Sequence, residues 1–496
     1  MDAPVIIVGG GPTGLSLSLG LAHHGVANVV LERSDAPEDR ARAFVLWPRT
    51  AEVLRDWNAW APLRAAGTFV PEIAVYDCGT GLPALFVNFC VLDETFNDPG
   101  ALLLAQAQAE KILRDLVRTS PLCDLREGWS ATGVAQDDAG ATVTATDAGG
   151  ASHELRCSYV AGCDGANGIV REAAGVELEG VTYGMRVVVT DERVERTLGA
   201  PSFRASFAPV LALGIEYEPG IWRVISPLPK AASDEDACAD AGHGARMRAL
   251  FGDAAERAQN LCRGFYTIHR HHAQRFVRGR IALAGDAAHL NSPAGGQGLN
   301  VGIHDAANLA WKLAYALRGG DAEVLLASYD SERREMMTDG VENYANRLAR
   351  YGQLTQSWFK KRGLALLRRA LRGKGMQAKA ARGLGMLNGR YTKSAIVNPR
   401  HPAAGKRVGD LRLPDGTRVN EARKGGAAVL AVGKADVGDR ETIRIPAIPK
   451  RWHIKTPAAL IIRPDGCVAS VVEKPTPEKI EAAWAAAFPI AGIPYE

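Results

Sequence analysis

The chain has 496 residues, which is enough to bury several hydrophobic cores, and its length predicts two or three domains. It is 47% hydrophobic and 23% charged, as is typical of a soluble globular protein, and it has no run of 18 apolar residues that would predict a membrane span. The formal net charge is only +4, so charge alone indicates no nucleic-acid partner.

The eight cysteines have neither a Cys-x-x-Cys pair nor the paired spacing of metal ligands. We therefore expect reduced thiols, with no disulfide framework and no metal site. The first four residues lead directly into a predicted strand, without the basic segment and cleavage site of a signal peptide. These features together favour a cytoplasmic location.

A dinucleotide-binding pattern opens the chain. An apolar run over residues 4–8 predicts a central parallel strand, and a Gly-x-Gly-x-x-Gly sequence follows at once. A predicted helix over residues 15–24 and a second strand that ends at Glu32 complete the pattern. The glycines allow a tight turn, the approach of a pyrophosphate and close packing of the helix, and Glu32 is placed to bind a ribose diol. The expected nucleotide contacts here are Gly9, Gly11, Pro12, Thr13, Gly14, Glu32 and Arg33.

Three further candidate residues precede the middle of the chain. Arg42 is a site candidate, although a surface salt bridge is the ordinary role of an arginine. Gln106, the first residue of a predicted helix, is a second site candidate, and the alternative is that it only caps this helix. Asp164 belongs to an Asp-Gly sequence before a short predicted helix, and Arg171 is placed to order that turn. A purely structural Asp-Gly turn is the alternative.

A predicted sheet follows, with strands over residues 186–190, 202–207, 210–217 and 221–225 joined by Pro/Gly turns. Four side chains in or after it are candidates to line a pocket: Arg204, Tyr217, Trp222 and His269. Tyr217 and His269 can exchange protons with a ligand, although each residue taken singly is more typical of packing or of the surface.

A strand predicted over residues 280–284 then delivers Asp286 to a Gly/Pro loop that contains Pro293, and a helix is predicted over residues 298–317. The N-terminus of that helix offers unpaired N–H groups and a positive dipole end to an anion. Asp286 can accept hydrogen bonds from a polyol, and a Gly-rich loop with one capping aspartate is the alternative. The backbone expected to face a phosphate or an electron-rich ring belongs to Gly298, Leu299 and Asn300.

The rest of the chain has two parts. Residues 343–409 contain 16 Lys or Arg and no Asp or Glu, which favours a basic helical linker packed on an acidic body over a membrane-surface helix. Residues 409–496 predict a small α/β module with a single cysteine, so dithiol exchange is excluded there.

Three motif segments carry a resemblance: the Gly-rich segment at residues 9–14, the Asp164 segment and the Asp286 segment. In this order they resemble those of the FAD-dependent aromatic hydroxylases, the single-component flavoprotein monooxygenases related to p-hydroxybenzoate hydroxylase. The resemblance extends over nearly the whole chain. It is greatest to the branch that contains 3-(3-hydroxyphenyl)propionate hydroxylase and polyketide-tailoring hydroxylases. It implies that NADPH or NADH reduces FAD, that O2 forms a flavin C4a-hydroperoxide, and that the distal oxygen attacks an electron-rich, phenolic ring.

The resemblance also implies roles for single residues. Arg42 would lie near the FAD pyrophosphate and the path of NAD(P)H, Gln106 at the ribityl chain, and Asp164 between FAD and the nicotinamide. Phe44 stands where phenol-hydroxylating relatives often have an aspartate, so the catalytic base stays open. The residues assigned to catalysis are Arg42, Pro293, Tyr217 and His269.

The expected architecture is a Rossmann-like α/β FAD-binding domain (residues 1–75, 98–178 and 270–345) interleaved with a β-sheet substrate domain (76–97 and 179–269). A basic linker (346–408) and a thioredoxin-like C-terminal domain (409–496) follow. We expect a monomer or homodimer with a small aromatic substrate. The alternatives are a flavin-bound protein that sequesters or senses an aromatic compound, another FAD oxidoreductase of this fold, and a plain NAD-dependent dehydrogenase.

Overall fold

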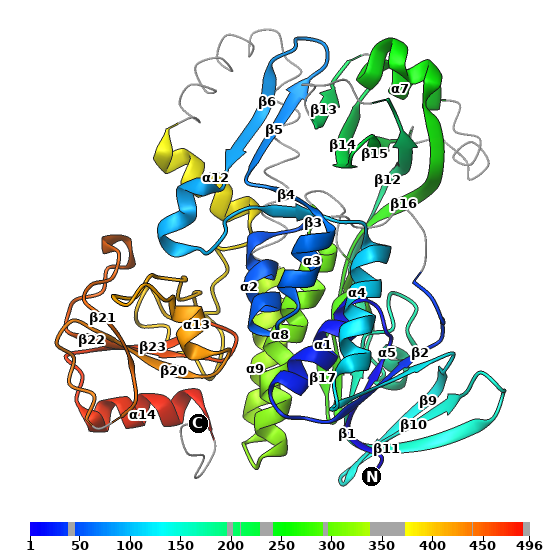
Figure 1. Cartoon of the computed structure of the whole chain (residues 1–496). Coiled ribbons are helices and arrows are strands. Elements are labelled where there is room, and N and C mark those ends of the chain that lie inside the picture. The colour runs from blue at the N-terminus through cyan, green and yellow to red at the C-terminus, as the bar shows by residue number, and fades with distance from the viewer. Residues whose placement is uncertain are drawn as a thin grey trace.

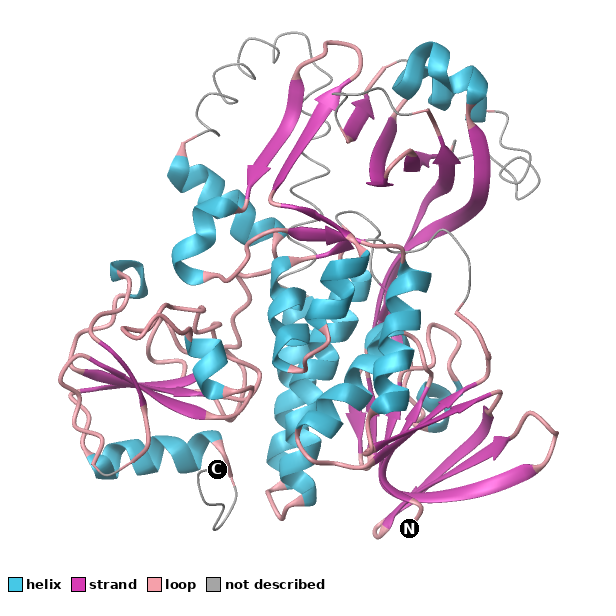
Figure 2. Cartoon of the chain, viewed as in Figure 1, coloured by secondary structure: helices cyan, strands magenta, loops and turns pink. Residues whose placement is uncertain are grey.

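The computed structural model describes residues 1–37, 45–195, 202–208, 210–228, 242–290, 296–337, 373–438 and 440–489. These residues form a central α/β body, a second sheet above it and a smaller C-terminal module at the lower left (Figure 1). Helices gather in the central body, and strands dominate the upper one (Figure 2).

The central body is built on an eight-stranded sheet with the order β17-β18-β11-β1-β2-β8, which β10 and β9 extend from β11. The middle of this sheet is parallel, because β1 pairs in parallel with β11 and β2, and β11 pairs in parallel with β18. The strands are β1 (Ala3–Val8), β2 (Asn28–Glu32), β8 (Cys123–Glu127), β9 (Ser130–Asp137), β10 (Gly140–Thr146), β11 (Ser152–Gly162), β17 (Val277–Arg278) and β18 (Ile281–Leu283).

Helices pack on this sheet through apolar stripes. Helix α8 occupies the residues that the 3.6-residue periodicity predicts, and its apolar side joins the core formed by β1 and α1. Gly20 lets α1 and α8 approach closely, since a Cβ at this position would lie 2.9 Å from the Cβ of Ala310. The helices of this body are α1 (Pro12–His23), α4 (Gln106–Thr119), α5 (Ile169–Ala173), α8 (Gly298–Leu317) and α9 (Ala322–Glu335).

A small three-stranded sheet, in the order β3-β7-β4, joins the central body to the upper one. Its strands are β3 (Val45–Leu46), β4 (Thr68–Val70) and β7 (Ala101–Leu103), and two helices lie between β3 and β4, α2 (Pro48–Asp56) and α3 (Trp60–Ala66). Pro48 occupies the first turn of α2, where its missing N–H costs no hydrogen bond.

The upper body is an eight-stranded sheet with the order β19-β16-β12-β15-β14-β13-β5-β6. Its strands are β5 (Glu72–Asp77), β6 (Pro83–Asn88), β12 (Leu178–Arg193), β13 (Phe203–Ser206), β14 (Ala212–Glu218), β15 (Ile221–Pro227), β16 (Gln259–Ala273) and β19 (His289–Leu290). The four predicted strands overlap β12, β13, β14 and β15, one each, and two of them were predicted to begin one or two residues too early. The long strand β16 was not predicted, because its polar and apolar residues show no regular alternation.

The two faces of the upper sheet have different neighbours. One face is covered by α7 (His243–Phe251), which packs on Trp222 and Val224. The other face, which we call the inner face, contributes Phe203, Ile215 and Tyr217 to a core shared with Val45 and Trp47 from the lower part of the chain. A ligand held between the two bodies would therefore contact the inner face.

The C-terminal module contains a four-stranded sheet in the order β21-β20-β22-β23, in which only the β20–β21 pair is parallel. Trp311 of α8 and Leu325 of α9 belong to the same core as Ile461 and Phe488 of the module, so the module packs on these two helices. Its elements are α13 (Val419–Arg423), β20 (Ala428–Val432), β21 (Ile443–Ile445), β22 (Ala458–Ile462), β23 (Val468–Glu473) and α14 (Pro477–Ala487).

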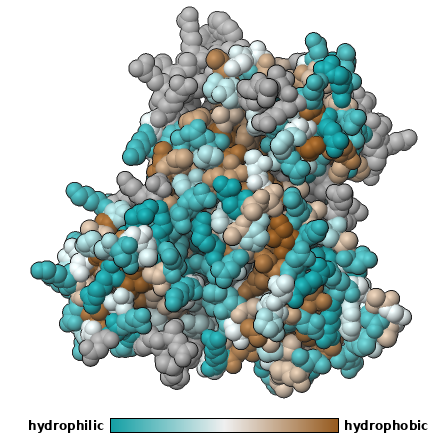
Figure 3. Space-filling model, in the orientation of Figure 1, coloured by the Kyte–Doolittle hydropathy of each residue, from teal (hydrophilic) through white to brown (hydrophobic). Residues whose placement is uncertain are grey.

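The basic segment is described only in part. Its helix α12 (Lys374–Leu384) packs on β6 and η1 (Cys90–Thr95), as a linker on the body would, and the earlier part lies outside the described residues. No helix of the described ranges is long and apolar enough to cross a membrane. On the face shown in Figure 3, polar and charged residues dominate, and apolar residues show between them in separate patches.

Candidate functional site

Three loops meet at one edge of the central sheet. The last residue of β1, Val8, pairs with Gly162 at the end of β11, and Gly162 in turn pairs with Leu283 at the end of β18. Because all three strands are parallel, the Gly-rich loop, the Asp164 loop and the Asp286 loop leave the sheet side by side. This is the edge at which parallel α/β sheets bind ligands.

Close packing between these loops explains several of the glycines. Gly9 has a φ of +105°, and a Cβ there would collide with the carbonyl of Cys163 in the second loop. Gly285 has a φ of +62°, and a Cβ there would lie 2.6 Å from Oγ1 of Thr13. A Cβ at Gly302 of α8 would collide with the same hydroxyl. Thr13, predicted as a nucleotide contact, therefore also joins the first loop to the third.

Open space lies where a dinucleotide would need it. Among the described residues, a Cβ at Gly11 would meet only Oε1 of Glu110, at 3.9 Å, and a Cβ at Gly298 would meet nothing within 4 Å. These glycines lie at the starts of α1 and α8, and no side chain in the described part of the chain caps either helix. Both N-termini can therefore offer N–H groups to an anionic ligand. The residues present fit FAD, whose pyrophosphate and ring need such room.

Glu32 lies at the end of β2, where the ribose of a dinucleotide is expected. Its Oε2 accepts a hydrogen bond of 2.6 Å from the N–H of Gly10, and its Oε1 accepts one of 2.9 Å from the N–H of Ser34. Each carboxylate oxygen can accept a second bond, so Glu32 is oriented by the loop and can still accept from ribose hydroxyls. Arg33 beside it is exposed.

The Asp286 loop forms a short 3-10 turn, η3 (Gly285–Ala287), directly after β18. Gly285 and Ala287 are buried, whereas Asp286 between them is exposed at the edge of the sheet. A carboxylate in this place is suited to a polyol such as the ribityl chain. Gln106, at the start of α4, and Leu299, in the first turn of α8, are partly buried.

The Asp164 loop is held by its own side chains. Oδ2 of Asp164 accepts a hydrogen bond of 3.0 Å from the N–H of Val170, while its Oδ1 is buried without a partner among the described residues. Burial raises the pKa of Asp164. Arg171 donates to the carbonyls of Ala166 (2.6 Å) and Ala287 (3.1 Å). The bond to Ala166 lies within the turn that Arg171 was expected to order, and the bond to Ala287, which was not predicted, ties the second loop to the third.

Both polar atoms of the Asn300 side chain form hydrogen bonds within the protein. Its Oδ1 accepts from the N–H of Trp47 (2.9 Å) and the hydroxyl of Thr50 (2.6 Å), and its Nδ2 donates to the carbonyls of Val45 and Gly296, both at 2.9 Å. The side chain fastens the start of α2 to the start of α8. A ligand could therefore contact only the backbone of Asn300, and that contact stays a prediction.

Sequence reasoning missed a carboxylate beneath the third loop. Asp305 of α8 accepts the N–H of Gly285 at 2.9 Å and lies 2.6 Å from both Nε2 of His289 and Nε of Arg333. One pattern in the sequence could have indicated that α8 has buried polar side chains that need hydrogen-bond partners. Polar residues recur there every four positions, at Asn300, His304, Asn308 and Lys312, along an otherwise apolar helix.

The predicted pocket in the sheet needs a correction, because its four residues do not lie together. Trp222 is buried beneath α7, and Arg204 stacks on it there, with the guanidinium carbon 5.1 Å from the ring centroid. His269 follows Ile268 on β16 and so points to the face opposite the one where Ile268 packs with Val187.

Tyr217 belongs to the inner face and is 6% exposed. Its neighbour Ile215 is level with Asp191 of β12 through Arg223, and Asp191 pairs with Cys262 of β16. His269 lies seven residues further along β16, about 23 Å away at about 3.3 Å per residue. Tyr217 and His269 therefore cannot act in one pocket. Two other predicted site residues, Arg42 and Pro293, lie outside the described residues.

The comparisons with known proteins agree with this geometry. Residues 2–344 match the family model described as FAD binding domain. The chain is 30% identical over 459 residues to a 12-dehydrotetracycline 5-monooxygenase/anhydrotetracycline 6-monooxygenase of Streptomyces rimosus, covering 84% of this chain and 82% of that one. It is 32% identical over 341 residues to a para-nitrophenol 4-monooxygenase of a Pseudomonas species, covering 68% and 83%.

A solved structure extends the similarity to the whole molecule. The anhydrotetracycline hydroxylase from Streptomyces rimosus superposes with a TM-score of 0.77 at 26% identity, covering 98% of this chain and 99% of that one. From the matched family model, the relatives and the three loops at one sheet edge it follows that the chain belongs to the family of FAD-dependent aromatic hydroxylases.

Proposed function

We propose that this protein is an FAD-dependent monooxygenase that uses NADPH or NADH and O2 to hydroxylate an electron-rich aromatic compound. The observation that carries the proposal is the meeting of the Gly11, Asp164 and Asp286 loops at the ends of three adjacent parallel strands, with open space at two helix N-termini. FAD, when bound, supplies the chemistry of electron transfer and oxygen activation.

Different residues of the chain would bind different parts of this cofactor and the substrate. Glu32 would accept from the ribose, the N-terminus of α1 would face the pyrophosphate, and Asp286 would accept from the ribityl hydroxyls. The N-terminus of α8 would face the flavin ring. The inner face of the upper sheet would hold the aromatic substrate and keep water away from the reacting atoms.

Two further properties belong to this proposal. The enzyme would act in the cytoplasm as a monomer or homodimer. Its substrate would be a phenol, since the named relatives act on tetracycline precursors and on nitrophenol and since an electron-rich ring suits oxygen transfer.

The test is a screen of phenols against the purified yellow protein. Oxidation of NAD(P)H should be faster with some phenols than without them, and the product should gain one oxygen atom by mass. Tight binding of a phenol that stimulates no oxidation would favour the alternative, a flavin protein that sequesters or senses aromatic compounds. Stimulated oxidation that always yields unmodified phenol would contradict the hydroxylase and favour another FAD oxidoreductase.

A further inference from the structure

A single carboxylate holds both ends of the Asp286 loop. The N–H of Gly285 donates to Oδ2 of Asp305 at 2.9 Å, and Nε2 of His289 lies 2.6 Å from the same oxygen. The other oxygen, Oδ1, accepts from Nε of Arg333 at 2.6 Å. The side chains of Asp305, His289 and Arg333 are at most 3% exposed, so the position of the loop depends on this buried contact.

The residue before Arg333 is Glu332, which makes a buried polar contact with the C-terminal module, residues 409–489. Both oxygens of Glu332 accept from Arg463 in that module, at 2.6 Å from Nη1 and 2.8 Å from Nη2. The same carboxylate accepts from Lys312 at 2.9 Å and from Ser394 at 2.6 Å. Glu332 and Arg463 are fully buried, and a bidentate pair of hydrogen bonds fixes the relative position and orientation of the two side chains.

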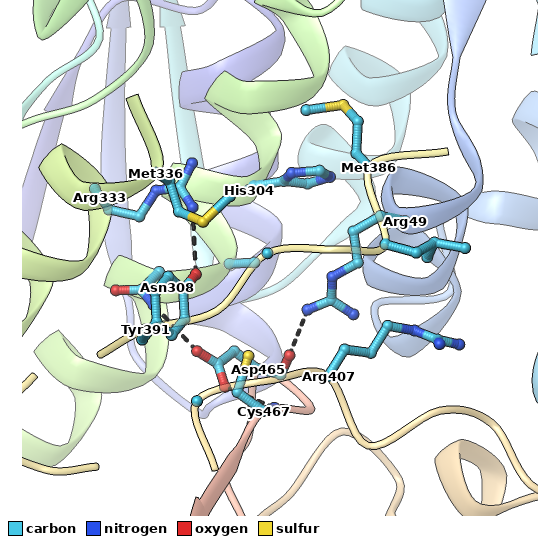
Figure 4. Close-up of a pocket in the computed structure, with 14 residues that line it drawn as sticks. Arg49, His304, Asn308, Arg333, Met336, Met386, Tyr391, Arg407, Asp465 and Cys467 are labelled. Carbon is cyan, nitrogen blue, oxygen red and sulfur yellow. Dashed lines mark hydrogen bonds between the residues drawn. The ribbon is translucent and has the colours of Figure 1, made fainter. Parts of the chain in front are cut away.

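The two contacts therefore hold two consecutive residues in the last turn of α9. Asn308 of α8 strengthens the arrangement, since its Nδ2 donates to Glu332 at 2.7 Å and to Asp465 of the module at 3.1 Å. Figure 4 shows Arg333, Asn308, Tyr391 and Asp465 around one small cavity of about 40 Å³. That volume holds only a few water molecules, so α9 has little room to shift while both contacts persist.

We propose that the C-terminal module positions the flavin-binding loop through this chain of contacts, from Arg463 to Glu332, along the backbone to Arg333, and on to Asp305 and Gly285. Arg463, Arg333 and Asp305 are positioning residues, because none of them reaches the edge of the sheet where FAD would lie. The proposal rests on the FAD site of the proposed function, and it is independent of the aromatic substrate.

The test is the affinity of the apoprotein for FAD, measured by quenching of flavin fluorescence. Arg463→Met should raise the Kd for FAD at least tenfold, because α9 loses its fixed position and Asp305 loses Arg333 as a fixed partner. The matched control is Arg423→Met. Arg423 belongs to the same module and pairs with Asp56 of α2 in the central body, with no hydrogen bond to α9 among the described residues. This control should change the Kd less than threefold.

A double-mutant cycle separates positioning from general loss of stability. In a protein that already carries Asp305→Asn, Arg463→Met should have little further effect on the Kd for FAD, since the last contact of the chain is already weakened. Independent, multiplying effects of the two substitutions would overturn the proposal. Equal effects of Arg463→Met and Arg423→Met would do so as well.

A milder variant keeps the test decisive if Arg463→Met does not fold. Arg463→Lys keeps the positive charge but loses the two parallel hydrogen bonds to Glu332. Its Kd for FAD should be higher than that of the wild type, and a Kd equal to that of the wild type would contradict the proposal. Failure of every phenol to stimulate NAD(P)H oxidation would leave this FAD measurement unaffected, so the two proposals fail separately.

Discussion

Asp191 and Arg223 form a bidentate ion pair on the inner face of the upper sheet. Nε of Arg223 donates to Oδ1 at 2.8 Å and Nη2 donates to Oδ2 at 2.6 Å, and the guanidinium carbon lies 5.2 Å from the ring centroid of Tyr217. The two side chains are 10% and 3% exposed. Asp191 thus neutralises the charge of an arginine on the face where the substrate is proposed to bind.

This pairing predicts a preference for uncharged phenols. The matched pair 3-propylphenol and 3-(3-hydroxyphenyl)propionate differs mainly in the carboxylate, and the uncharged compound should stimulate NAD(P)H oxidation more strongly. Asp191→Asn removes the carboxylate from Arg223 and should shift the preference toward the acid by tenfold or more, since hydrogen bonds to charged groups contribute about 1.5–3 kcal/mol. A wild-type preference for the acid would contradict this prediction.

Gly11→Val should yield a folded, colourless protein. The structure leaves space for a side chain at this position, so the sheet and α1 should form, but the branched side chain would occupy the room for the pyrophosphate. The visible absorbance of the purified variant and its circular dichroism measure the two effects. Gly14→Val is the contrast, because its Cβ would collide with the carbonyl of Gly9 and should prevent folding. A Gly11→Val protein with full flavin content would refute the placement of the nucleotide.

Asp286→Ala should keep the fold and weaken FAD binding. The side chain is exposed at the sheet edge, so its loss leaves no cavity, whereas a charge-assisted hydrogen bond to the ribityl chain is worth about 1.5–3 kcal/mol, or about 10- to 150-fold in Kd. Titration of the apoprotein with FAD gives the change. An unchanged Kd would remove Asp286 from the cofactor site.

Arg42→Ala should slow reduction of the flavin by NAD(P)H more than it slows oxygen transfer. The incoming dinucleotide is anionic, and the family resemblance puts this arginine on its path. Stopped-flow absorbance measures the reduction step. The chemically reduced variant, mixed with O2 and a good phenol, should still form product, and Asp164→Asn should behave alike. Equal damage to both steps would mean that these residues only hold the flavin.

Lys312 should make stability depend on pH in the alkaline range. Burial lowers its pKa to about 8, despite the opposing effect of Glu332, while the unfolded chain keeps the ordinary value of 10.5. Between these values the unfolded state binds the extra proton, so the free energy of unfolding should rise with pH from about 8 to 10.5. Urea unfolding of the wild type and Lys312→Met gives the comparison, and the variant should lack this rise. Identical pH profiles would contradict the prediction.

Local sequence patterns were sufficient to predict the elements of this protein that depend on residues close together in the chain. The spacing of Gly9, Gly11 and Gly14 after an apolar run and before Glu32 is a property of about 30 consecutive residues, and the structure has the strand, turn, helix and strand that it predicts. Helix α8 follows from the 3.6-residue period of its apolar side chains. The order of the three motifs was sufficient to indicate the family.

The contacts between residues that are far apart in the chain became known only from the folded structure. Glu332 and Arg463 are 131 positions apart, and nothing in the sequence around either one predicts their pairing. Tyr217 and His269 are both in strands, yet the register of β12, β14 and β16 puts them on opposite faces of one sheet. A shift of register by one residue would exchange the two faces, and register is fixed by packing between strands rather than by local sequence, which is why the sequence left these contacts undetermined.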